Sequence, residues 1–488
     1  MLALFLLPLL ALSILCIVYL HLLHLAIQHV PPEAAAASHK RFRDEQVSAT
    51  AQTLRRNPVN VVPFLGQRTG RRYIVVGGSG FVGGWIVLHL LARGEAAARV
   101  RILDLRAPSR SDVMNALKDG VEFIQTNITD ENSVKAAFSA SWPEGDEALK
   151  HGLTVFHTAS LIRFIERVKF LLPPIAKVNV RGTQIVLDAA RDAGATALVY
   201  TSSSSVGVRS THWLSALWRS WPEHFVQFLD DHDTNLPQTF SECFSTYAFT
   251  KMEAETWLRT VCLRPGQGIY GSGGDAVVDA YMHRGISPTW TENIIQNCIY
   301  VENCSIGHLC AEAALLLPNT RVGGRAFYIS DPNLPIAYGD IYTAVELLTS
   351  GRCKYITLHA GLVFALAHVV EAYHLTRSSI LPILPQLPGD SILLQPSTFT
   401  IASTHVIIND SIARQRVEEG GLGYRAPFTS LQGIVWTALQ HEDSRTSGKA
   451  AIQTGGLVSG PTNITVAPLK ADSTTLLPTA APTYGEAD

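Results

Sequence analysis

The sequence predicts an α/β fold with a doubly wound parallel sheet, preceded by a transmembrane helix. Three observations predict it. Short apolar stretches at 73–76, 100–104, 121–124, 154–157 and 197–201 are separated by segments long enough to form helices. The first stretch runs directly into a glycine-rich turn, and a long uncharged segment precedes them all. Strands that alternate with helices pair in parallel, because each helix carries the chain back along the sheet.

The N-terminal stretch from Met1 to Gln28 contains no Asp, Glu, Lys or Arg. At 1.5 Å per residue, a helix of this length exceeds the ~30 Å hydrocarbon core of a bilayer. No basic residue precedes it and it is about twice as long as a signal-peptide core, so we expect a retained anchor rather than a cleaved signal. Lys40, Arg41 and Arg43 follow it. The positive-inside rule then predicts a single pass with a cytosolic body, which we expect at the endoplasmic reticulum membrane.

The segment from Tyr73 to Gly84, YIVVGGSGFVGG, joins the first strand to a helix. Its glycines suit a tight turn, close approach of backbone N–H groups to a phosphate, and packing of the helix on the strand. The helix N-terminus adds a partial positive charge. The segment therefore indicates a dinucleotide-binding turn, with an ordinary strand–turn–helix as the alternative. The residues expected at the dinucleotide are Gly77, Gly80, Phe81, Val82 and Gly83.

The second strand ends in Asp104. A carboxylate at this place accepts hydrogen bonds from both ribose hydroxyls of an adenosine and repels a 2′-phosphate, so the sequence favours NAD over NADP. Arg106, two residues later, would tolerate that phosphate. A solvated carboxylate at a strand end is the plain alternative for Asp104.

Tyr247 and Lys251 stand four residues apart in STYAFTKMEAE, which places both on one face of a helix. A phenol with an ordinary pKa of about 10 is a poor base at neutral pH, and a neighbouring ammonium group lowers that pKa. Tyr247 would then accept the proton of an alcohol, while Lys251 also holds the nicotinamide ribose. Ser203 follows the fifth strand and would hydrogen-bond the same oxygen. An ordinary surface pair is the plain alternative for Tyr247 and Lys251.

These motifs resemble those of the extended short-chain dehydrogenase/reductases, and within them the 3β-hydroxysteroid dehydrogenase and sterol-4α-carboxylate 3-dehydrogenase family. The resemblance extends to VFHTAS, NVRGTQIVLDAA, TVCLRPGQGIYGSGG, YVEN and LGYRAPFTSLQG, and covers residues 72–440. It implies a Rossmann fold and NAD-dependent oxidation of a ring alcohol to a ketone. It places the family's catalytic serine, tyrosine and lysine on Ser203, Tyr247 and Lys251. It also places the asparagine of a proton relay on Asn179 and a cofactor contact on His157.

The chain departs from the family after the catalytic helix, where only Met252 to Leu258 separate Lys251 from RTVCLRP. A crossover helix must run back along its strand before the next parallel strand begins. We therefore expect either a trimmed crossover or a displaced catalytic pair with impaired activity.

Composition and motifs together divide the chain into five segments. Pro–Pro and an alanine run mark a linker before the first strand, and the final residues are rich in Ser, Thr, Gly, Pro and Ala without periodicity. The segments are an anchor at 1–28, a tether at 29–71, a Rossmann NAD-binding domain with the catalytic residues at 72–270, a mainly substrate-binding part at 271–440 and a disordered tail at 441–488.

Two further apolar segments stand out, one between Ser203 and Tyr247 and one in the C-terminal third. Residues 213–231 carry aromatic side chains at helical spacing, which favours core packing over a lid or membrane-surface element. Residues 356–375 are apolar over too short a length to span a bilayer and are expected to be buried or interfacial. They include His368, Glu371 and His374, but we expect no metal because the reaction needs none.

Composition also limits the partners. A net charge of −2 provides no electrostatic footprint for nucleic acid. Hydrophobic residues make up 47% of the chain and charged residues 16%, which favours a lipid or a lipid-like ligand. The seven scattered cysteines match no common zinc spacing and indicate reduced thiols.

These expectations combine into a membrane-anchored NAD-dependent dehydrogenase that oxidises a 3β-hydroxyl group of a sterol, steroid or triterpenoid. Loss of a C4 carboxylate and ring double-bond isomerisation stay open. The expected partners are a lipophilic substrate, the membrane, and either a second copy or other membrane-bound enzymes of the pathway. Two alternatives remain: an oxidoreductase of specialised metabolism acting on another polycyclic alcohol or ketone, and a non-catalytic NAD-binding homologue.

Overall fold

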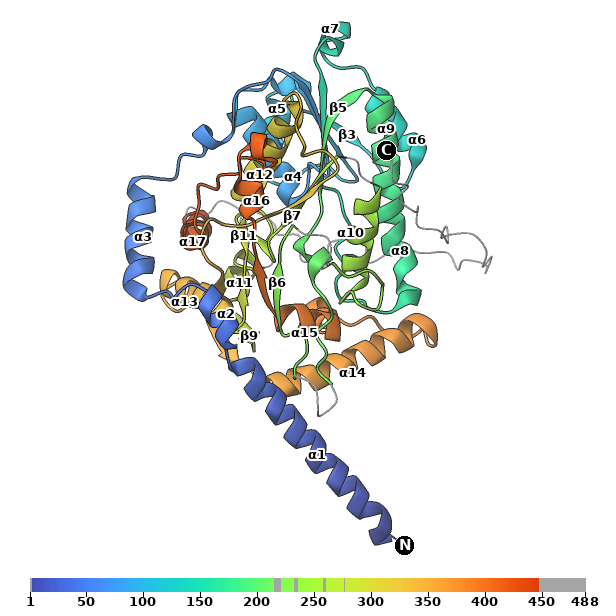
Figure 1. The fold of residues 1–488 in the computed structure, drawn as a ribbon, viewed down its shortest axis with the longest axis vertical. Helices are drawn as coiled ribbons and strands as arrows, with labels where there is room; N and C mark the ends of the chain where they lie inside the picture. The colour runs from blue at the N-terminus through green and yellow to red at the C-terminus, as the bar shows by residue number, and fades with distance from the viewer. Residues whose placement is uncertain (1, 215–220, 232–235, 258–259, 276, 447–488) are drawn as a thin grey trace.

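A parallel sheet of seven strands lies at the centre of the computed structural model (Figure 1). The model describes residues 2–214, 221–231, 236–257, 260–275 and 277–446. The strand order is β12-β7-β5-β4-β1-β2-β3. The strands are β1 (Arg72–Val76), β2 (Val100–Asp104), β3 (Glu122–Gln125), β4 (Leu153–His157), β5 (Ala195–Thr201), β7 (Val261–Pro265) and β12 (Ala326–Ile329). The five strands expected from the sequence are confirmed, and the strand order reverses between β1 and β4, where such sheets bind ligands.

Helices cover both faces of this sheet, because alternate residues of its strands point to opposite sides. Tyr73 and Val75 of β1 pack in one apolar cluster, whereas Ile74 and Val76 pack in another. The first cluster includes residues of α4 (Phe81–Ala92), α5 (Ser111–Lys118) and α12 (Val301–Leu316). The second includes residues of α6 (Glu131–Ser139), α9 (Thr183–Asp192) and α10 (Thr246–Thr256). The predicted doubly wound architecture is therefore confirmed.

A smaller set of strands lies beside the main sheet. Its four-stranded sheet has the order β13-β10-β15-β6, and two further pairs join β11 to β8 and β14 to β9. These strands are β6 (Val226–Leu229), β8 (Ile269–Tyr270), β9 (Ile286–Thr289), β10 (Ile295–Gln296), β11 (Ile299–Tyr300), β13 (Ile336–Ala337), β14 (Lys354–Thr357) and β15 (His405–Ile408). The remaining helices include α7 (Asp146–Leu149), α8 (Leu172–Ala176), α11 (Asp279–Arg284), α13 (Tyr338–Leu348), α14 (Ala360–Ser379), α15 (Pro396–Ala402), α16 (Ser411–Arg414) and α17 (Ser430–Thr446).

The layers do not follow the predicted division at residue 270. Strand β12 and helix α12 come after that residue, yet they complete the main sheet and one of its helical layers. Strand β6 comes before it and belongs to the second sheet. Pairing with β12 covers the edge that β7 would otherwise expose, which explains why the later segment returns to the main sheet.

The predicted tether is wrong in part, because it contains α2 (Pro32–Ala37) and the packed helix α3 (Asp44–Arg56). Val47, Ala51 and Leu54 repeat at helical spacing, and all three are buried in a cluster that includes residues of α13 and α17. Composition suggests a linker here, whereas the hydrophobic period specifies a helix.

The first residues of the predicted disordered tail are helical. Helix α17 continues through residues 441–446, and residues 447–488 lie outside the described residues.

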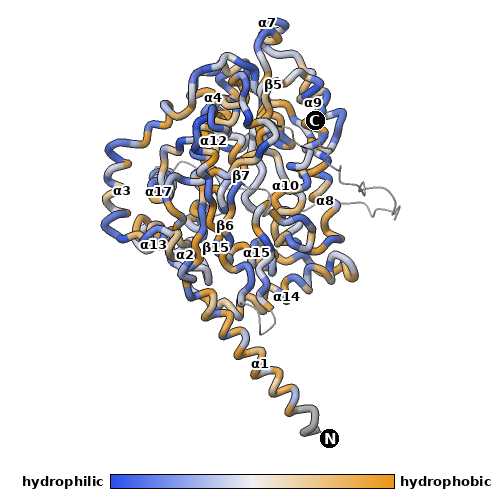
Figure 2. Tube along the Cα trace, viewed as in Figure 1, coloured by the Kyte–Doolittle hydropathy of each residue, from blue (hydrophilic) through white to orange (hydrophobic). Residues whose placement is uncertain are grey.

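Helix α1 (Leu2–Gln28) projects from the body and is apolar along its length (Figure 2). Among the described residues, one stretch, Leu7–Ala37, is long and apolar enough to cross a membrane by length and composition, and only 11% of its most apolar window is buried. Leu23 and Ile27, near the C-terminal end of α1, are buried against residues of α14.

The two apolar segments near the catalytic motifs pack into the same cluster as α1. Trp213 and Phe225 are buried there, which favours core packing for the first segment, while residues 215–220 lie outside the described residues. The segment at 356–375 forms most of α14, which is buried on one face and exposed on the other. The seven cysteines are all free, in agreement with the expected thiols.

Candidate active site

The glycine turn lies between the end of β1 and the start of α4. Gly77 has φ of +87°, and a Cβ atom there would lie 2.6 Å from the backbone nitrogen of Ala159. A Cβ atom on Gly83 would lie 2.2 Å from the carbonyl oxygen of Gly77. Both positions therefore require glycine. Gly80 is exposed at the N-cap of α4, where no side chain caps the first N–H groups of the helix.

Asp104 lies beside this turn. Its Oδ2 accepts a hydrogen bond from the backbone N–H of Ser79 at 3.1 Å. Burial raises the pKa of Asp104, and hydrogen bonds from the backbone N–H groups of Arg106 and Ser79 oppose the rise. The Ser79 hydroxyl is buried without a partner among the described residues. A glycine cradle, uncapped helix N–H groups and a strand-end carboxylate fit the pyrophosphate and adenosine ribose of NAD.

Tyr247 is the second residue of α10, with Ser245 as the N-cap. Its side chain is buried, and its hydroxyl interacts with the hydroxyls of Ser203 and Ser160. Burial raises the pKa of Tyr247 to about 12, and the two serine hydroxyls oppose this rise. The expectation that Lys251 lowers this pKa is therefore not met in this structure, because the serines are the groups that lower it.

Lys251 lies one turn further along α10 and is 2% exposed. Its Nζ donates hydrogen bonds to the carbonyl oxygen of Thr201 at 2.8 Å and to the hydroxyl of Tyr200 at 3.3 Å. Burial lowers the pKa of Lys251 to about 7. The lysine therefore changes its charge near neutral pH.

Asn179 lies in the π-helical turn Lys177–Gly182 and is buried. Its Oδ1 accepts hydrogen bonds from the backbone N–H of Leu161 at 2.8 Å and from the Ser160 hydroxyl at 3.1 Å. Its Nδ2 donates to the hydroxyl of Thr250 at 3.1 Å. Asn179 thus reaches Tyr247 through Ser160, a residue that the sequence motifs did not single out although it ends VFHTAS.

His157 ends β4 and is fully buried. Its Nε2 pairs with the Thr183 hydroxyl at 3.1 Å, and burial together with the charge of Lys251 lowers its pKa to about 3. The next two residues, Thr158 and Ala159, lie against Gly77 instead. The structure therefore places the residues after His157, rather than its ring, at the glycine turn.

The short crossover after Lys251 leaves this residue in contact with Thr201 at the end of β5. Strand β7 pairs only with the last three residues of β5, beginning with Val199 opposite Val261. The chain must therefore run back over only ~10 Å of strand. The 11-residue helix α10 is ~16 Å long, which is enough to cover this distance. Glu255 of α10 also binds Arg264 of β7, with oxygen–nitrogen distances of 2.6 and 3.0 Å. The crossover is trimmed, and Tyr247 still meets Ser203.

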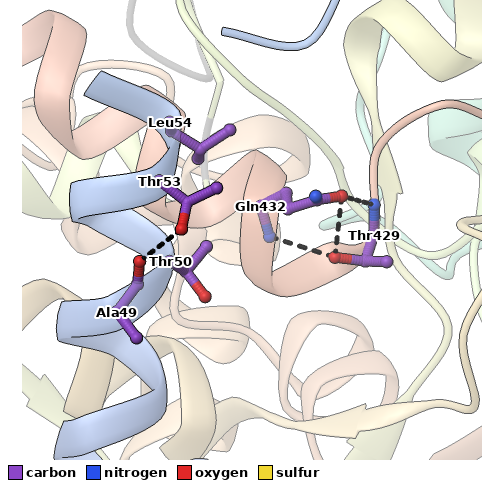
Figure 3. A pocket seen from close by; sticks show the side chains of 6 residues that line it. All are labelled: Ala49, Thr50, Thr53, Leu54, Thr429 and Gln432. Atoms are coloured by element: carbon purple, nitrogen blue, oxygen red, sulfur yellow. Dashed lines mark hydrogen bonds between the residues drawn. The ribbon is translucent and has the colours of Figure 1, made fainter. Parts of the chain in front are cut away.

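Two hollows lie away from these groups. One lies between α3 and the start of α17 and is lined by Ala49, Thr50, Thr53, Leu54, Thr429 and Gln432 (Figure 3). It contains no ionisable side chain, and its polar groups bond within their own segments, as Thr53 does with Ala49. The other lies beside Gly207 and β6. Neither hollow is lined by Ser203 or Tyr247, so neither coincides with the predicted site.

The residues suspected of binding a metal in α14 have protein partners. Glu371 pairs with Arg167 at 2.7 Å, and His374 lies 3.5 Å from Glu166. Within the described residues, a different group, Asp279, His283 and His441, brings three ligand atoms within 4.8 Å of one another. It joins α11 to α17 and includes no residue of the predicted site.

Comparison with known proteins identifies the family. A model of the 3-beta hydroxysteroid dehydrogenase/isomerase family matches residues 74–346. The chain belongs to this family. The match begins within β1 and includes the glycine turn, Asp104, Ser203, Tyr247 and Lys251.

Curated relatives agree with the family assignment. The chain is 27% identical over 365 residues to mouse 3 beta-hydroxysteroid dehydrogenase type 7, a match that covers 73% of this chain and 92% of the mouse protein. It is 27% identical over 403 residues to Arabidopsis thaliana 3beta-hydroxysteroid-dehydrogenase/decarboxylase isoform 2, which covers 79% of this chain. The chain spans only 64% of that plant protein. Family membership makes the chain a dehydrogenase that acts on a CH–OH group with NAD as its cofactor.

Solved structures with the same fold are more distant in sequence. UDP-glucose 4-epimerase of Thermotoga maritima is 16% identical with a TM-score of 0.50, and the match covers 77% of this chain and 99% of the epimerase. An epimerase of Methanothermobacter thermautotrophicus is 18% identical with the same TM-score, over 79% of this chain and 96% of the other. These likenesses show the extended α/β fold.

Proposed function

We propose that this chain is a membrane-anchored, NAD-dependent enzyme that oxidises the 3β-hydroxyl group of a sterol, steroid or triterpenoid to a ketone. The observation that carries the proposal is the buried Tyr247 hydroxyl between Ser203 and Ser160, one helical turn from Lys251, in a chain of this family. These groups are arranged to hold an alcohol oxygen and to remove its proton.

Each residue has a distinct task in the proposed reaction. NAD, when bound, accepts a hydride from the carbon that bears the hydroxyl group. Gly77, Gly80 and Gly83 let backbone N–H groups approach its pyrophosphate, and Asp104 holds the adenosine ribose. These positions are consistent with NAD rather than NADP, because a carboxylate at Asp104 repels a 2′-phosphate.

Proton removal is assigned to Tyr247. Ser203 hydrogen-bonds the substrate oxygen, and Tyr247 in its phenolate form accepts the substrate's proton as the ketone forms. Lys251, with a pKa of about 7, is the nearby group that can gain or lose a proton near neutral pH. Ser160 and Asn179 extend the hydrogen-bonded path away from Tyr247.

A substrate that carries a carboxylate at C4 would undergo a second reaction after the same oxidation. Oxidation at C3 then yields a β-keto acid, which loses carbon dioxide readily without a dedicated residue. The name of the plant relative, a dehydrogenase/decarboxylase, supports this version of the substrate. We therefore propose both plain and 4-carboxylated 3β-hydroxysterols as candidates.

The proposed location is the endoplasmic reticulum membrane, with α1 as a single span and the body in the cytosol. The apolar, largely exposed α1 and the basic residues Lys40, Arg41 and Arg43 that follow it support this orientation. Protease added to intact microsomes should digest the body. A glycan on the exposed Asn127 sequon would instead place the body in the lumen.

Purified full-length protein in detergent or lipid tests the substrate class. With NAD and a panel of 3β-hydroxysterols, with and without a C4 carboxylate, we expect NADH and the matching ketone. The 3α-hydroxy epimers serve as matched controls and should react poorly. Absence of turnover across the whole 3β panel would refute the substrate class, and turnover confined to other polycyclic alcohols would favour an enzyme of specialised metabolism.

A further inference from the structure

We propose that the outward face of α14, with the turn that follows it, is a bilayer-contact surface seated in the same membrane that α1 enters. We call it the α14 surface, and its apolar residues are Leu362, Leu366, Val369, Ile380, Leu381 and Ile383. The proposed role in substrate entry, described below, rests on the proposed function; the bilayer contact itself does not.

The packing of α14 against α1 fixes the level at which the bilayer would end. A Cβ atom on Gly361 would lie 2.1 Å from the carbonyl oxygen of Leu20, so the two backbones touch. Leu23 and Ile27 are buried on the same side of α1, whereas Leu7 to Val18 carry mostly exposed apolar side chains. Residues 2–20 of α1 span ~27 Å, which is close to the hydrocarbon thickness of a bilayer. A bilayer around this part of α1 therefore reaches α14.

The exposed side of α14 has the composition of a membrane-contact helix. Leu362, Leu366 and Val369 recur at helical spacing, with exposed fractions of 64%, 51% and 64%. The turn after α14 adds Ile383, which is 90% exposed, while Val363 and Phe364 on the opposite face are buried. A contiguous apolar stripe on the outside of a packed helix is unusual for a surface facing water.

Charge on α14 is compatible with lipid. Glu371 is the helix's single acidic residue, and it is buried and bound by Arg167 through two hydrogen bonds of 2.7 Å. The outward face therefore presents no carboxylate to anionic headgroups. Arg377, in the last turn, places a positive charge near the end of the stripe. The α14 surface adjoins α1. This favours a bilayer, rather than a second copy of the chain, as what covers the surface.

The segment after β4 connects the α14 surface to the reaction centre. Arg167 and Glu166 of this segment contact Glu371 and His374 of α14. The carbonyl oxygen of Glu166 accepts a hydrogen bond of 2.7 Å from the backbone N–H of Thr246, the residue before Tyr247. The same segment includes Ser160. Helix α10 thus lies one segment away from the α14 surface. The proposed role in substrate entry is that a lipid-soluble alcohol leaves the bilayer at this surface and reaches the site past this segment.

Depth measurement in a membrane tests the contact. Full-length protein with Cys16→Ser and Leu366→Cys is labelled with a fluorophore and reconstituted into phosphatidylcholine vesicles. The matched control carries the label at Met114→Cys on α5, which lies far from α1 (Figure 1) and has a 40% exposed side chain. The parent Cys16→Ser protein corrects for labelling of native cysteines.

Nitroxide-labelled lipids should quench the label at 366 at least about threefold more than the label at 114, and a water-soluble quencher should show the reverse order. Equal quenching by the lipids at both positions would overturn the proposal. Shielding of the label at 366 from both quenchers would also overturn it, because a protein partner or a second copy would then cover the surface.

Substrate entry is tested by Leu366→Glu against Met114→Glu. For a 3β-hydroxysterol delivered in vesicles, we expect the apparent Michaelis constant of Leu366→Glu to rise at least about threefold, with kcat and NAD affinity unchanged. The constant for a water-soluble hydroxysteroid should not change. An equal rise for both substrates would contradict the entry role. Absence of turnover in the parent protein would refute the proposed function and leave the quenching result intact.

Discussion

Ser160 connects Tyr247, the proposed proton acceptor, to a buried asparagine. Its hydroxyl interacts with Tyr247 and donates to Asn179. Sequence motifs predicted Ser203, Tyr247, Lys251 and Asn179, because strand ends and helical spacing place such residues together. They did not indicate Ser160, since its role depends on the path of the loop after β4. The VFHTAS motif located this loop but not the direction of the side chain.

Ser160→Ala tests this connection. The substitution removes one hydroxyl group from the side chain that links Tyr247 to Asn179, so we expect kcat to fall roughly tenfold while the dissociation constant of NAD stays unchanged. Ser160→Thr retains the hydroxyl group and should keep most of the rate. Steady-state kinetics with fluorescence titration of NAD separates the two effects. A rate for Ser160→Ala equal to that of the parent would remove Ser160 from the site.

Asp104→Ala tests the predicted cofactor preference. Loss of hydrogen bonds to a charged acceptor should weaken NAD binding about tenfold or more and narrow the preference over NADP, because repulsion of the 2′-phosphate is lost. Asp119→Ala removes an exposed carboxylate from the end of α5 and serves as the control. Calorimetric titration measures both constants. An unchanged NAD constant would mean that another group holds the ribose.

Lys251 should set the pH dependence of the oxidation. Its pKa is lowered from the ordinary value to about 7, so the side chain is positively charged below pH 7 and neutral above it. Oxidation releases a proton, and only the neutral amine can take one up. We therefore expect kcat to fall as the pH drops below about 7 and to level off above it. Lys251→Arg keeps the charge throughout this range and should abolish the transition, whereas a parent midpoint near pH 10 would contradict the assignment.

At the scale of secondary-structure elements, the spacing of hydrophobic residues predicted the structure better than amino-acid composition did. The five strands were predicted because each has a clear apolar pattern. The segment before β1 was misread as a tether, since its prolines and alanines obscured the spacing of Val47, Ala51 and Leu54. The length of the crossover after Lys251 could not be interpreted from sequence, because it depends on how little of β5 is paired with β7.

Leu54→Ala tests whether α3 is a packed element. Leu54 is 2% exposed, so truncation should leave a cavity and lower the free energy of unfolding by about 2–4 kcal/mol. Thr53→Ala, at an exposed position of the same helix, is the control and should change it by less than about 0.5 kcal/mol. Denaturant unfolding in a fixed detergent measures the difference. Equal stabilities would mean that α3 is detached from α17 in solution.

At the scale of the whole molecule, the fold class and family were predictable, whereas the boundaries between parts were not. The parallel sheet and the nucleotide-binding turn follow from the alternation of strands and helices and from the glycines after β1. The contribution of β12 to the main sheet is a contact between residues more than 60 positions apart, from Cys262 to Ala326, and no local pattern encodes it. The arrangement of α1 beside α14 is likewise a tertiary contact, and it brings the proposed anchor to the side of the body that connects with the catalytic helix.

The most direct test of the central claim follows hydrogen from C3 of the substrate. Full-length protein in vesicles receives NAD and a 3β-hydroxysterol that carries deuterium at C3. We predict one deuterium in each NADH formed and one 3-ketone for each NADH, with a rate that falls at least about 10²-fold in Tyr247→Phe while NAD binding is retained. NADH without deuterium, no turnover of any 3β-hydroxysterol, or an unchanged rate in Tyr247→Phe would contradict the account.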